Sequence, residues 1–158
     1  MAIPSRYANS NAALSPERTF FATTKTHMGQ RLLQSDRNVE LLIDVLRSCV
    51  AEKKFRLHDF VIMPDHVHLL LTVDGKMTIE KAMQLIKGRF SYRLKKEFGY
   101  LGEVWQLGFS ELRADHAEAF AAYQKYIADN PVKAGLVESP EQYPYCFSSL
   151  AAKKAGRG

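Results

Sequence analysis

Alternating residues between positions 66 and 73 predict a β-strand whose two faces differ in character. Successive side chains of a strand point to opposite sides of the sheet, so one set can enter a core while the other stays accessible. The apolar set consists of Val67, Leu69, Leu71 and Val73. His66 and His68 fall on the opposite face, together with Leu70 and Thr72. The strand therefore presents two imidazoles side by side, which suits the binding of a divalent metal ion.

Further periodic segments predict the elements around this strand. Strands are predicted at residues 19–26, 55–63, 66–73 and, as a shorter piece, 105–112. Apolar residues three and four positions apart predict helices at residues 38–54, 78–98 and 117–128. Asp36 or Asn38 can cap the first helix and Thr78 the second, whereas Asn130 followed by Pro131 should interrupt the third. Pro64 and Asp65 form a tight-turn signal, which makes the two strands they join antiparallel neighbours.

The order of these elements predicts the fold. Strand, helix, strand, strand, helix, strand is the split βαβ arrangement of a ferredoxin-like α+β domain. In such a domain the helices cover one face of an antiparallel sheet and the other face stays open. His66 and His68 would then look out of the open face, which would carry the active site. We assign residues 18–150 to this single domain, residues 1–17 to a flexible N-terminal arm and residues 151–158 to a basic C-terminal tail.

The charge of the chain favours an acidic partner. A formal net charge of +5 over 158 residues is compatible with binding to nucleic acid. Basic residues gather in the predicted helix at 78–98, where aromatic residues are interleaved with them. Lys87, Arg89 and Arg93 are the best candidates for phosphate contacts, with Lys25 in the first strand as a further one. The alternative is an ordinary solvated helix face.

The sequence offers no sign of export or of membrane insertion. No apolar run approaches the roughly 20 residues that span a bilayer, and the N-terminal residues lack the apolar stretch of a secretory signal. Cys49 and Cys146 lie far apart and in no metal-binding spacing, so a disulfide scaffold is not indicated. We therefore expect a protein of the reducing cytoplasm.

Two histidines alone do not define a site, because a His-x-His pattern also arises by chance on an accessible sheet face. Tyr126 and Asn130 add a second signal near the other end of the chain. They are four residues apart, so both project from the same side of a helix. A phenol and an amide oxygen could thus reach a site centred on one metal ion.

Together these motifs resemble a known family. His66-Val67-His68 and residues 126–137 resemble the single-tyrosine HUH transposases of insertion sequences, and among them most of all the REP-associated tyrosine transposases. Supporting similarity at residues 63–65, 86–90, 105–106 and 145–149 extends the resemblance over most of the chain. One departure concerns the subgroup. Many REP-associated members carry an aspartate-histidine pair in the strand that follows the position of Trp105 and Gln106. In this chain Asp115 and His116 come later than that.

The resemblance implies a metal-dependent DNA strand transferase and endonuclease that acts on single-stranded DNA at hairpin or REP-like sequences. Tyr126 would attack the scissile phosphate and leave a 5′-phosphotyrosine link with a free 3′-OH. His66, His68 and Asn130 would bind Mg²⁺ or Mn²⁺, although an asparagine before a proline is also a common helix N-cap arrangement. Tyr123, one turn before Tyr126, should mostly face the core.

Other functions stay open at the level of sequence. A catalytically silent descendant could recognise a hairpin and act as a regulator. A zinc hydrolase could use the two histidines, but no third His, Cys or carboxylate stands at convincing ligand spacing. The sequence permits either a monomer or a homodimer, and in a dimer the tyrosine helix could serve the partner's site.

Overall fold

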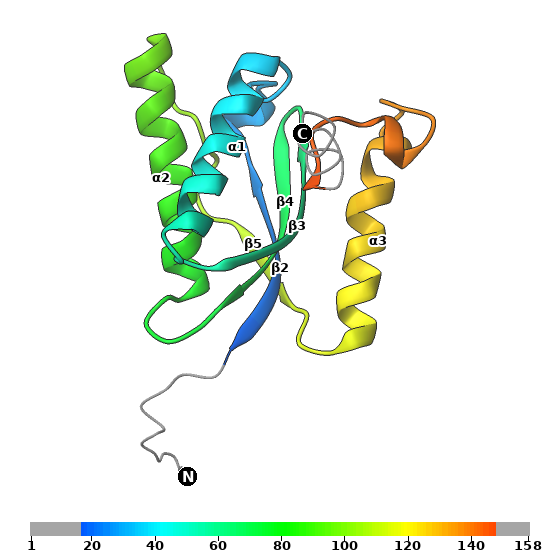
Figure 1. Ribbon diagram of the computed structural model, residues 1–158. Coiled ribbons are helices and arrows are strands. Elements are labelled where there is room, and N and C mark those ends of the chain that lie inside the picture. Colours follow the sequence, from blue (N-terminus) through cyan, green and yellow to red (C-terminus); the bar gives the residue numbers. More distant parts are fainter. Residues whose placement is uncertain (1–16, 148–158) are drawn as a thin grey trace, which may run out of the picture.

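In the computed structural model, which describes residues 17–147, three helices pack around a four-stranded antiparallel sheet (Figure 1). The strands are β2 (Arg18–Lys25), β3 (Arg56–Met63), β4 (His66–Val73) and β5 (Ser110–Arg113). The helices are α1 (Asp36–Ala51), α2 (Ile79–Phe98) and α3 (Ala117–Lys133), with short 3-10 turns η1 (His27–Gly29) and η2 (Pro140–Gln142). The predicted arm and tail lie outside the described residues, apart from Glu17, which pairs with Arg56.

The sheet order confirms the predicted fold class. The strands follow the order β3-β4-β2-β5, and each neighbouring pair is antiparallel. Because α1 connects β2 to β3 while β4 lies between them, the chain forms the split βαβ unit of a ferredoxin-like α+β domain. The two-residue turn at Pro64 and Asp65 joins β3 to β4, as the sequence predicts.

The main core lies between the sheet and the pair α1 and α2, which cover the same face (Figure 1). Val67, Leu69 and Leu71 of β4 are almost completely buried there. Thr78 caps α2, since its Oγ1 accepts a hydrogen bond from the Lys81 N–H at 3.1 Å. The cap predicted for α1 was wrong: the side chain that caps the helix is that of Ser35, which accepts a hydrogen bond from the Asn38 N–H at 3.2 Å.

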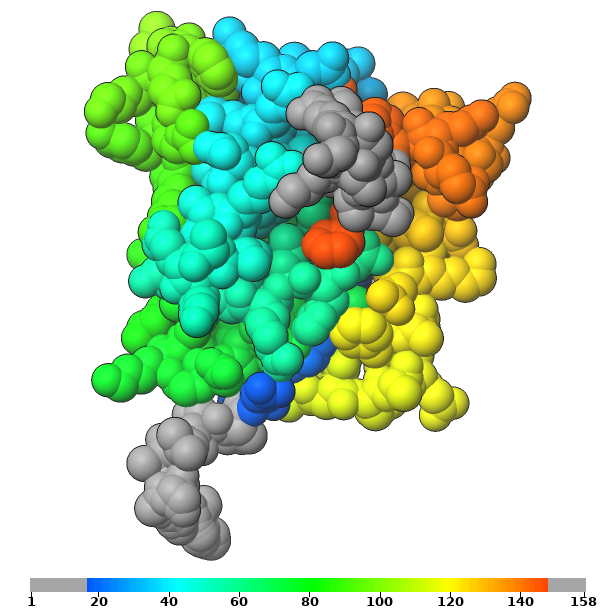
Figure 2. Space-filling view, in the orientation of Figure 1, coloured from blue at the N-terminus to red at the C-terminus, as the bar shows by residue number. Residues whose placement is uncertain are grey.

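The opposite face of the sheet is not left open along its whole length. Helix α3 lies across β3 and β4 on this side, away from α1 and α2 (Figure 1). Ile127 of α3 packs with Phe21, Val61 and Leu70 in a second, smaller core. These sheet residues are apolar, so leaving them in water would cost free energy that the helix recovers by covering them. In the surface view α3 forms a flank separate from α1 and α2 (Figure 2).

Helix α3 continues further than the sequence predicts. It runs to Lys133 and includes Pro131, whereas a break was expected at Asn130 and Pro131. Proline removes one N–H donor from a helix and strains the preceding turn, which generally costs about 3 kcal/mol in a helix interior. Here Pro131 and Ile127 are both buried, so packing offsets that cost close to the end of the helix.

The last predicted strand is shorter than expected. Only Ser110–Arg113 pairs with β2, while Trp105 forms an isolated bridge with Thr26. Between them Gly108 adopts a positive φ of 81°, which breaks the ladder. On the far edge of the sheet, the Ile62 N–H donates to the Tyr145 carbonyl, so the C-terminal segment covers the edge of β3. Within residues 17–147, no helix combines the length and hydropathy needed to cross a membrane.

Candidate active site

His66 and His68 lie next to each other at the start of β4. Their ring centroids are 4.8 Å apart and the rings are nearly perpendicular. The Nδ1 atom of His66 is 2.7 Å from the Asp65 carboxylate, and the Nδ1 atom of His68 is 2.7 Å from the Thr23 hydroxyl. Neither Nε2 atom has a hydrogen-bond partner among the described residues. Such contacts orient an imidazole and direct its second nitrogen to a metal ion.

The register of the sheet explains why these groups meet. In the antiparallel pair of β2 and β4, Thr23 lies opposite His68 and Lys25 lies opposite His66. Residues directly opposite in an antiparallel ladder share a face of the sheet. Lys25 is thus on the histidine face, where the sequence placed a phosphate contact. The contact from Thr23 was not anticipated, because a sequence by itself does not reveal which residues of two strands are paired.

The electrostatic surroundings keep His68 neutral. The residue is only 6% exposed, and burial together with the charges of His66 and Lys25 lowers its pKa to about 4. Removing an imidazolium from water is costly, and nearby positive charge adds to the cost. A neutral imidazole is the form that binds a metal.

The two tyrosines of α3 have different surroundings. The ring of Tyr123 stacks on Phe21 at 4.6 Å with an interplanar angle of 3°, which fixes it against the sheet. Tyr126 is 41% exposed, and its ring contacts His68 edge-on at 5.3 Å and Phe21 edge-on at 5.6 Å. Phe21 therefore contacts both tyrosines and also stacks on His68 at 5.2 Å. The accessible tyrosine is the one beside the histidines.

Asn130 lies one turn beyond Tyr126 in α3 and is half-buried. Its side-chain amide forms no hydrogen bond within the described residues, while its backbone carbonyl accepts from the Ala134 N–H. Residues 17–147 contain no group of three His, Cys, Asp or Glu side chains that could hold a metal. The assignment of Asn130 as a third ligand beside His66 and His68 stays a prediction from the sequence.

A lysine at the end of α3 approaches the accessible tyrosine. The Nζ atom of Lys133 is 5.6 Å from the centre of the Tyr126 ring. Lys125 is adjacent to Tyr126 in sequence but forms an ion pair of 2.7 Å with Asp129. Lys133 was not singled out from the sequence. The available signal was its place seven residues, or two helical turns, after Tyr126.

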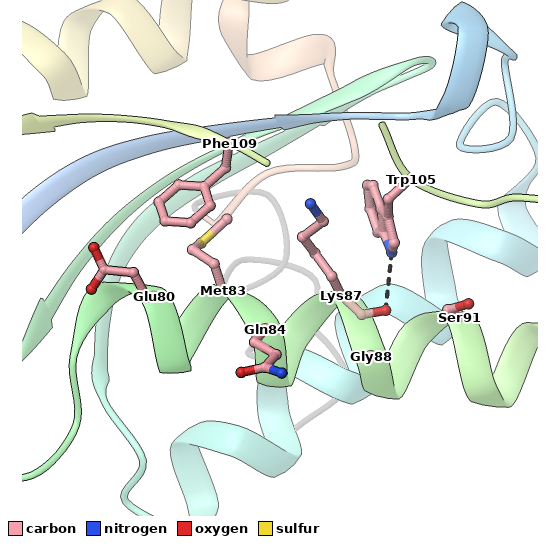
Figure 3. A pocket seen from close by; sticks show the side chains of 8 residues that line it. All are labelled: Glu80, Met83, Gln84, Lys87, Gly88, Ser91, Trp105 and Phe109. Atoms are coloured by element: carbon pink, nitrogen blue, oxygen red, sulfur yellow. Dashed lines mark hydrogen bonds between the residues drawn. The ribbon is translucent and has the colours of Figure 1, made fainter. Parts of the chain in front are cut away.

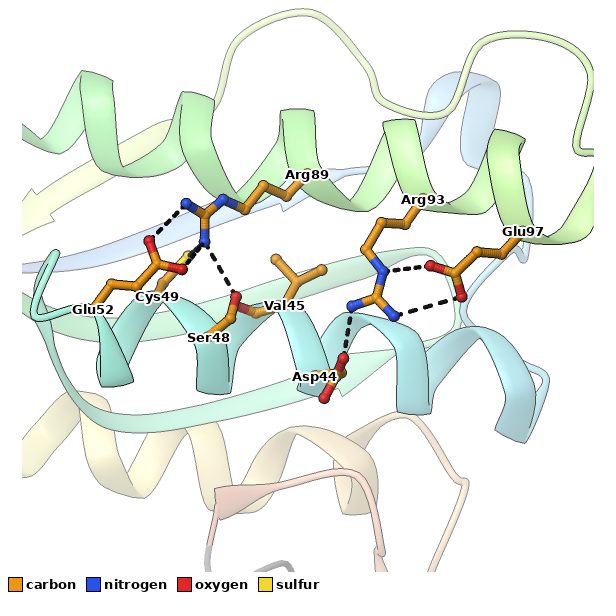
Figure 4. A network of polar contacts seen from close by, with 8 residues as sticks. All are labelled: Asp44, Val45, Ser48, Cys49, Glu52, Arg89, Arg93 and Glu97. Carbon is orange, nitrogen blue, oxygen red and sulfur yellow. Dashed lines mark hydrogen bonds and ion pairs between the residues drawn. The ribbon is translucent and has the colours of Figure 1, made fainter.

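The basic residues predicted on α2 do not gather at this site. Arg89 makes two hydrogen bonds to the carboxylate of Glu52, the residue that follows α1, at 2.8 and 3.1 Å (Figure 4). Arg93 pairs with Asp44 of α1 and with Glu97 of its own helix, both at 2.6 Å. These contacts tie α1 to α2 on the other side of the sheet from the histidines. We therefore leave both arginines out of the candidate DNA surface.

Lys87 has a different environment. Its ammonium donates to the carbonyls of Gly108 at 2.7 Å and Gln106 at 3.2 Å, in the segment that leads into β5. It thus lies near the sheet edge formed by β2 and β5, and neither on the histidine face nor against α1. Of the four predicted DNA contacts, only Lys25 shares a face with His66 and His68.

Comparison with known proteins identifies the family of this chain. The model of the family "Transposase IS200 like" matches residues 23–130, and the chain belongs to this family. The REP-associated tyrosine transposase of Escherichia coli (strain K12) is 23% identical over 127 residues, covering 80% of this chain and 73% of that protein. The ISDra2 transposase TnpA of Deinococcus radiodurans is 30% identical over 92 residues, covering 54% of this chain and 65% of that protein.

A solved structure supports the same fold. A REP-associated tyrosine transposase bound to a REP hairpin superposes with a TM-score of 0.70 at 23% identity. The match covers 92% of this chain and 82% of that chain. The family resemblance predicted from the two motifs is thereby confirmed.

Proposed function

We propose that this member of the transposase family cleaves and rejoins single-stranded DNA next to hairpins, with Tyr126 as the nucleophile. The observation that carries this proposal is the contact of the exposed Tyr126 ring with His68 at 5.3 Å. A phenol on one side and two oriented imidazoles on the other can approach the same phosphate.

The chemistry is a transesterification at phosphorus. The Tyr126 oxygen forms a bond to phosphorus while the bond from phosphorus to the 3′ oxygen breaks. The phenol proton is lost to water, and the departing 3′ oxygen takes a proton from water, so the products are a 5′-phosphotyrosine and a 3′-OH. The phosphodiester character is kept in the covalent link, so attack by another 3′-OH reseals DNA without a nucleotide cofactor.

The histidine pair is suited to hold Mg²⁺ or Mn²⁺. His66 and His68 would offer Nε2, since their Nδ1 atoms contact Asp65 and Thr23. Two imidazoles and the amide oxygen of Asn130 would form a set that leaves coordination positions for phosphate oxygens of the DNA. When bound, the ion would polarise the scissile phosphate and offset its developing negative charge.

The remaining residues would position the reacting groups. Phe21 contacts both His68 and Tyr126, so it fixes the distance between the nucleophile and the histidine face. Lys25 and Lys133 lie beside that face and supply positive charge for the DNA backbone. Each would contribute a contact that is independent of DNA sequence.

The substrate assignment rests on similarity. The solved relative is bound to a REP hairpin, and we extend this kind of DNA to the present chain. The cytoplasm is the expected location, since chromosomal DNA is reached there. A catalytically silent hairpin-binding regulator is the alternative that the experiment has to distinguish.

A covalent-capture assay tests the proposal. The protein is mixed with labelled single-stranded hairpins from the DNA that flanks its own gene, with Mn²⁺, and separated on a denaturing gel. We expect a shifted band that requires metal, disappears in Tyr126→Phe and persists in Tyr123→Phe, since the latter ring is occupied in stacking. Hairpin binding without a covalent band in any divalent metal would contradict the enzyme and favour the regulator.

A further inference from the structure

A cavity of about 350 Å³ lies away from the histidines, between α2 and the segment that leads into β5 (Figure 3). Its walls are mainly apolar and include Trp105, Phe109 and Met83. Two charged side chains border it, Lys87 and Glu80. Gly88 of α2 also lines the cavity, and the space where a Cβ would stand is open, with no atom within 4 Å. An open apolar recess with a few polar groups is typical of a ligand site.

The indole of Trp105 is held in one orientation. Its Nε1–H donates to the backbone carbonyl of Lys87 at 3.0 Å (Figure 3). Its ring packs on Phe90 of the main core, with centroids 5.5 Å apart and a tilt of 56°. The indole is only half-buried and also lines the cavity, so part of its ring is available to a ligand. A fixed aromatic surface binds a flat partner with little loss of conformational entropy.

The Lys87 ammonium completes the recess. It reaches from α2 toward the segment between Trp105 and Phe109 (Figure 3). There it donates to the backbone carbonyls of Gln106 and Gly108. An ammonium has three donors, so one remains after these two contacts. Burial lowers the pKa of this lysine, and a partly desolvated cation forms stronger contacts with an acceptor than an exposed one.

The recess is connected to the candidate active site by the course of the chain. Trp105 forms a bridge with Thr26, and the Gln106 N–H donates to the Lys25 carbonyl at 2.8 Å. The segment then follows the outer edge of β2 until Ser110 pairs with Thr23, the residue that contacts His68. A DNA strand leaving the histidine face therefore has to cross only this edge to reach the recess.

We propose that this recess binds one unstacked base of the single-stranded DNA next to the hairpin, with the base stacked on Trp105. The inference rests on the proposed function, because it names a subsite for the same substrate. Aromatic side chains and a lysine are the combination that binds single-stranded nucleic acid. The carboxylate of Glu80 at the border disfavours a phosphate inside the recess, so the base and not the backbone is the occupant.

Intrinsic fluorescence provides a direct readout, because Trp105 is the only tryptophan of the chain. The experiment uses the 158-residue chain with Tyr126→Phe, which removes the proposed nucleophile so that binding is measured without covalent capture. Emission is recorded during titration with a hairpin that carries a short single-stranded extension, on either side in turn. The same hairpin without an extension, and extensions with one abasic position at a time, serve as comparison ligands. Binding is followed independently by fluorescence anisotropy of a labelled DNA.

We expect the extended hairpin to quench the indole and the hairpin without extension to leave it unchanged. One abasic position should abolish the quenching and weaken binding roughly 5- to 150-fold, the range of one stacked base. Phe109→Ala and Lys87→Met should weaken binding of the extended hairpin only. Tyr92→Ala is the matched control, since Tyr92 is an aromatic residue of α2 that is 62% exposed and lies outside this recess.

The failures of the two proposals are distinguishable. A covalent adduct at Tyr126 without any base-dependent change in emission would overturn the subsite and leave the proposed function intact. Equal quenching by hairpins with and without an extension would also overturn it, because the signal would then not come from an unstacked base. If the protein bound none of these DNAs, the subsite and the proposed function would both be refuted.

Discussion

The hydroxyl oxygen of Thr23 on β2 lies 2.7 Å from Nδ1 of His68 on β4. If His68 offers Nε2 to a metal, Nδ1 carries the proton and donates it to this hydroxyl. The contact joins two strands that are separated in sequence by α1 and β3. Together with the contact of Asp65 with His66, it fixes the orientation of both imidazole rings.

Replacing Thr23 by valine should therefore weaken metal binding while keeping the fold. Valine has the same shape and strand preference but no hydroxyl, so the His68 ring loses its orienting partner. We expect the affinity for Mn²⁺ to fall about 10- to 100-fold, which calorimetric titration can measure. Thr19→Val is the control, since Thr19 contacts Thr72 at 2.7 Å on the same sheet but is remote from His68 in the register. Unchanged Mn²⁺ affinity in Thr23→Val would show that the contact does not orient the ligand.

The two tyrosines of α3 should differ in their contribution to stability. Tyr123 is half-buried and stacked on Phe21, so Tyr123→Ala should lower the free energy of unfolding by about 2–3 kcal/mol. Tyr126 is more exposed, and Tyr126→Ala should cost no more than about 1 kcal/mol. Urea unfolding followed by circular dichroism gives both values. A larger loss for Tyr126→Ala would mean that this ring is mainly structural.

Asp59 should make stability depend on pH. It lies at a bulge in β3, and burial raises its pKa from 3.8 to about 6, against the opposing hydrogen bond from the Phe60 N–H. The folded state then binds a proton more tightly than the unfolded state. The contribution of Asp59 to stability is fully present below the unfolded pKa and is lost as pH rises from about 4 through about 6.

Asp59→Asn should remove this dependence. The amide oxygen can still accept from the Phe60 N–H but carries no charge. At about pH 8 we expect the variant to be more stable by about 1 kcal/mol, after allowance for the part of the side chain that water screens. Thermal unfolding at several pH values measures the effect, with Asp74→Asn in an exposed turn as the control. Parallel pH profiles for Asp59→Asn and the parent protein would refute it.

Lys25 and Arg89 should affect DNA binding differently. Lys25 lies on the histidine face, so Lys25→Gln should weaken binding and reduce the slope of log affinity against log salt by about 0.7–0.9. Arg89 is paired with Glu52 on the other side of the sheet, so Arg89→Gln should leave that slope unchanged. Its cost should appear in stability instead, at roughly 0.5–1 kcal/mol. Binding titrations at several salt concentrations separate the two cases, and a reduced slope for Arg89→Gln would place DNA against α2.

Local patterns in the sequence determined most of the secondary structure and the faces of β4. The alternation along β4 correctly divides its residues between the main core and the histidine face, and Thr78 caps α2 as predicted. The resemblance of residues 66–68 and 126–137 to the transposase family singled out the histidine pair and Tyr126. Such features depend on residues that are close in sequence, because strand alternation and helix capping are set within a few residues.

Only the tertiary structure decided what depends on residues far apart in sequence. The coverage of the second sheet face by α3 allowed Pro131 to remain inside a helix, since burial offsets the lost hydrogen bond. Arg89 pairs with Glu52, directly after α1, because α1 and α2 pack against each other, so a residue of the basic cluster is held in an ion pair. The contacts of Thr23 with His68 and of Trp105 with Lys87 follow from strand register and from the course of the chain beside β2. No short pattern in the sequence specifies such pairings, because packing selects them only when the whole chain has folded.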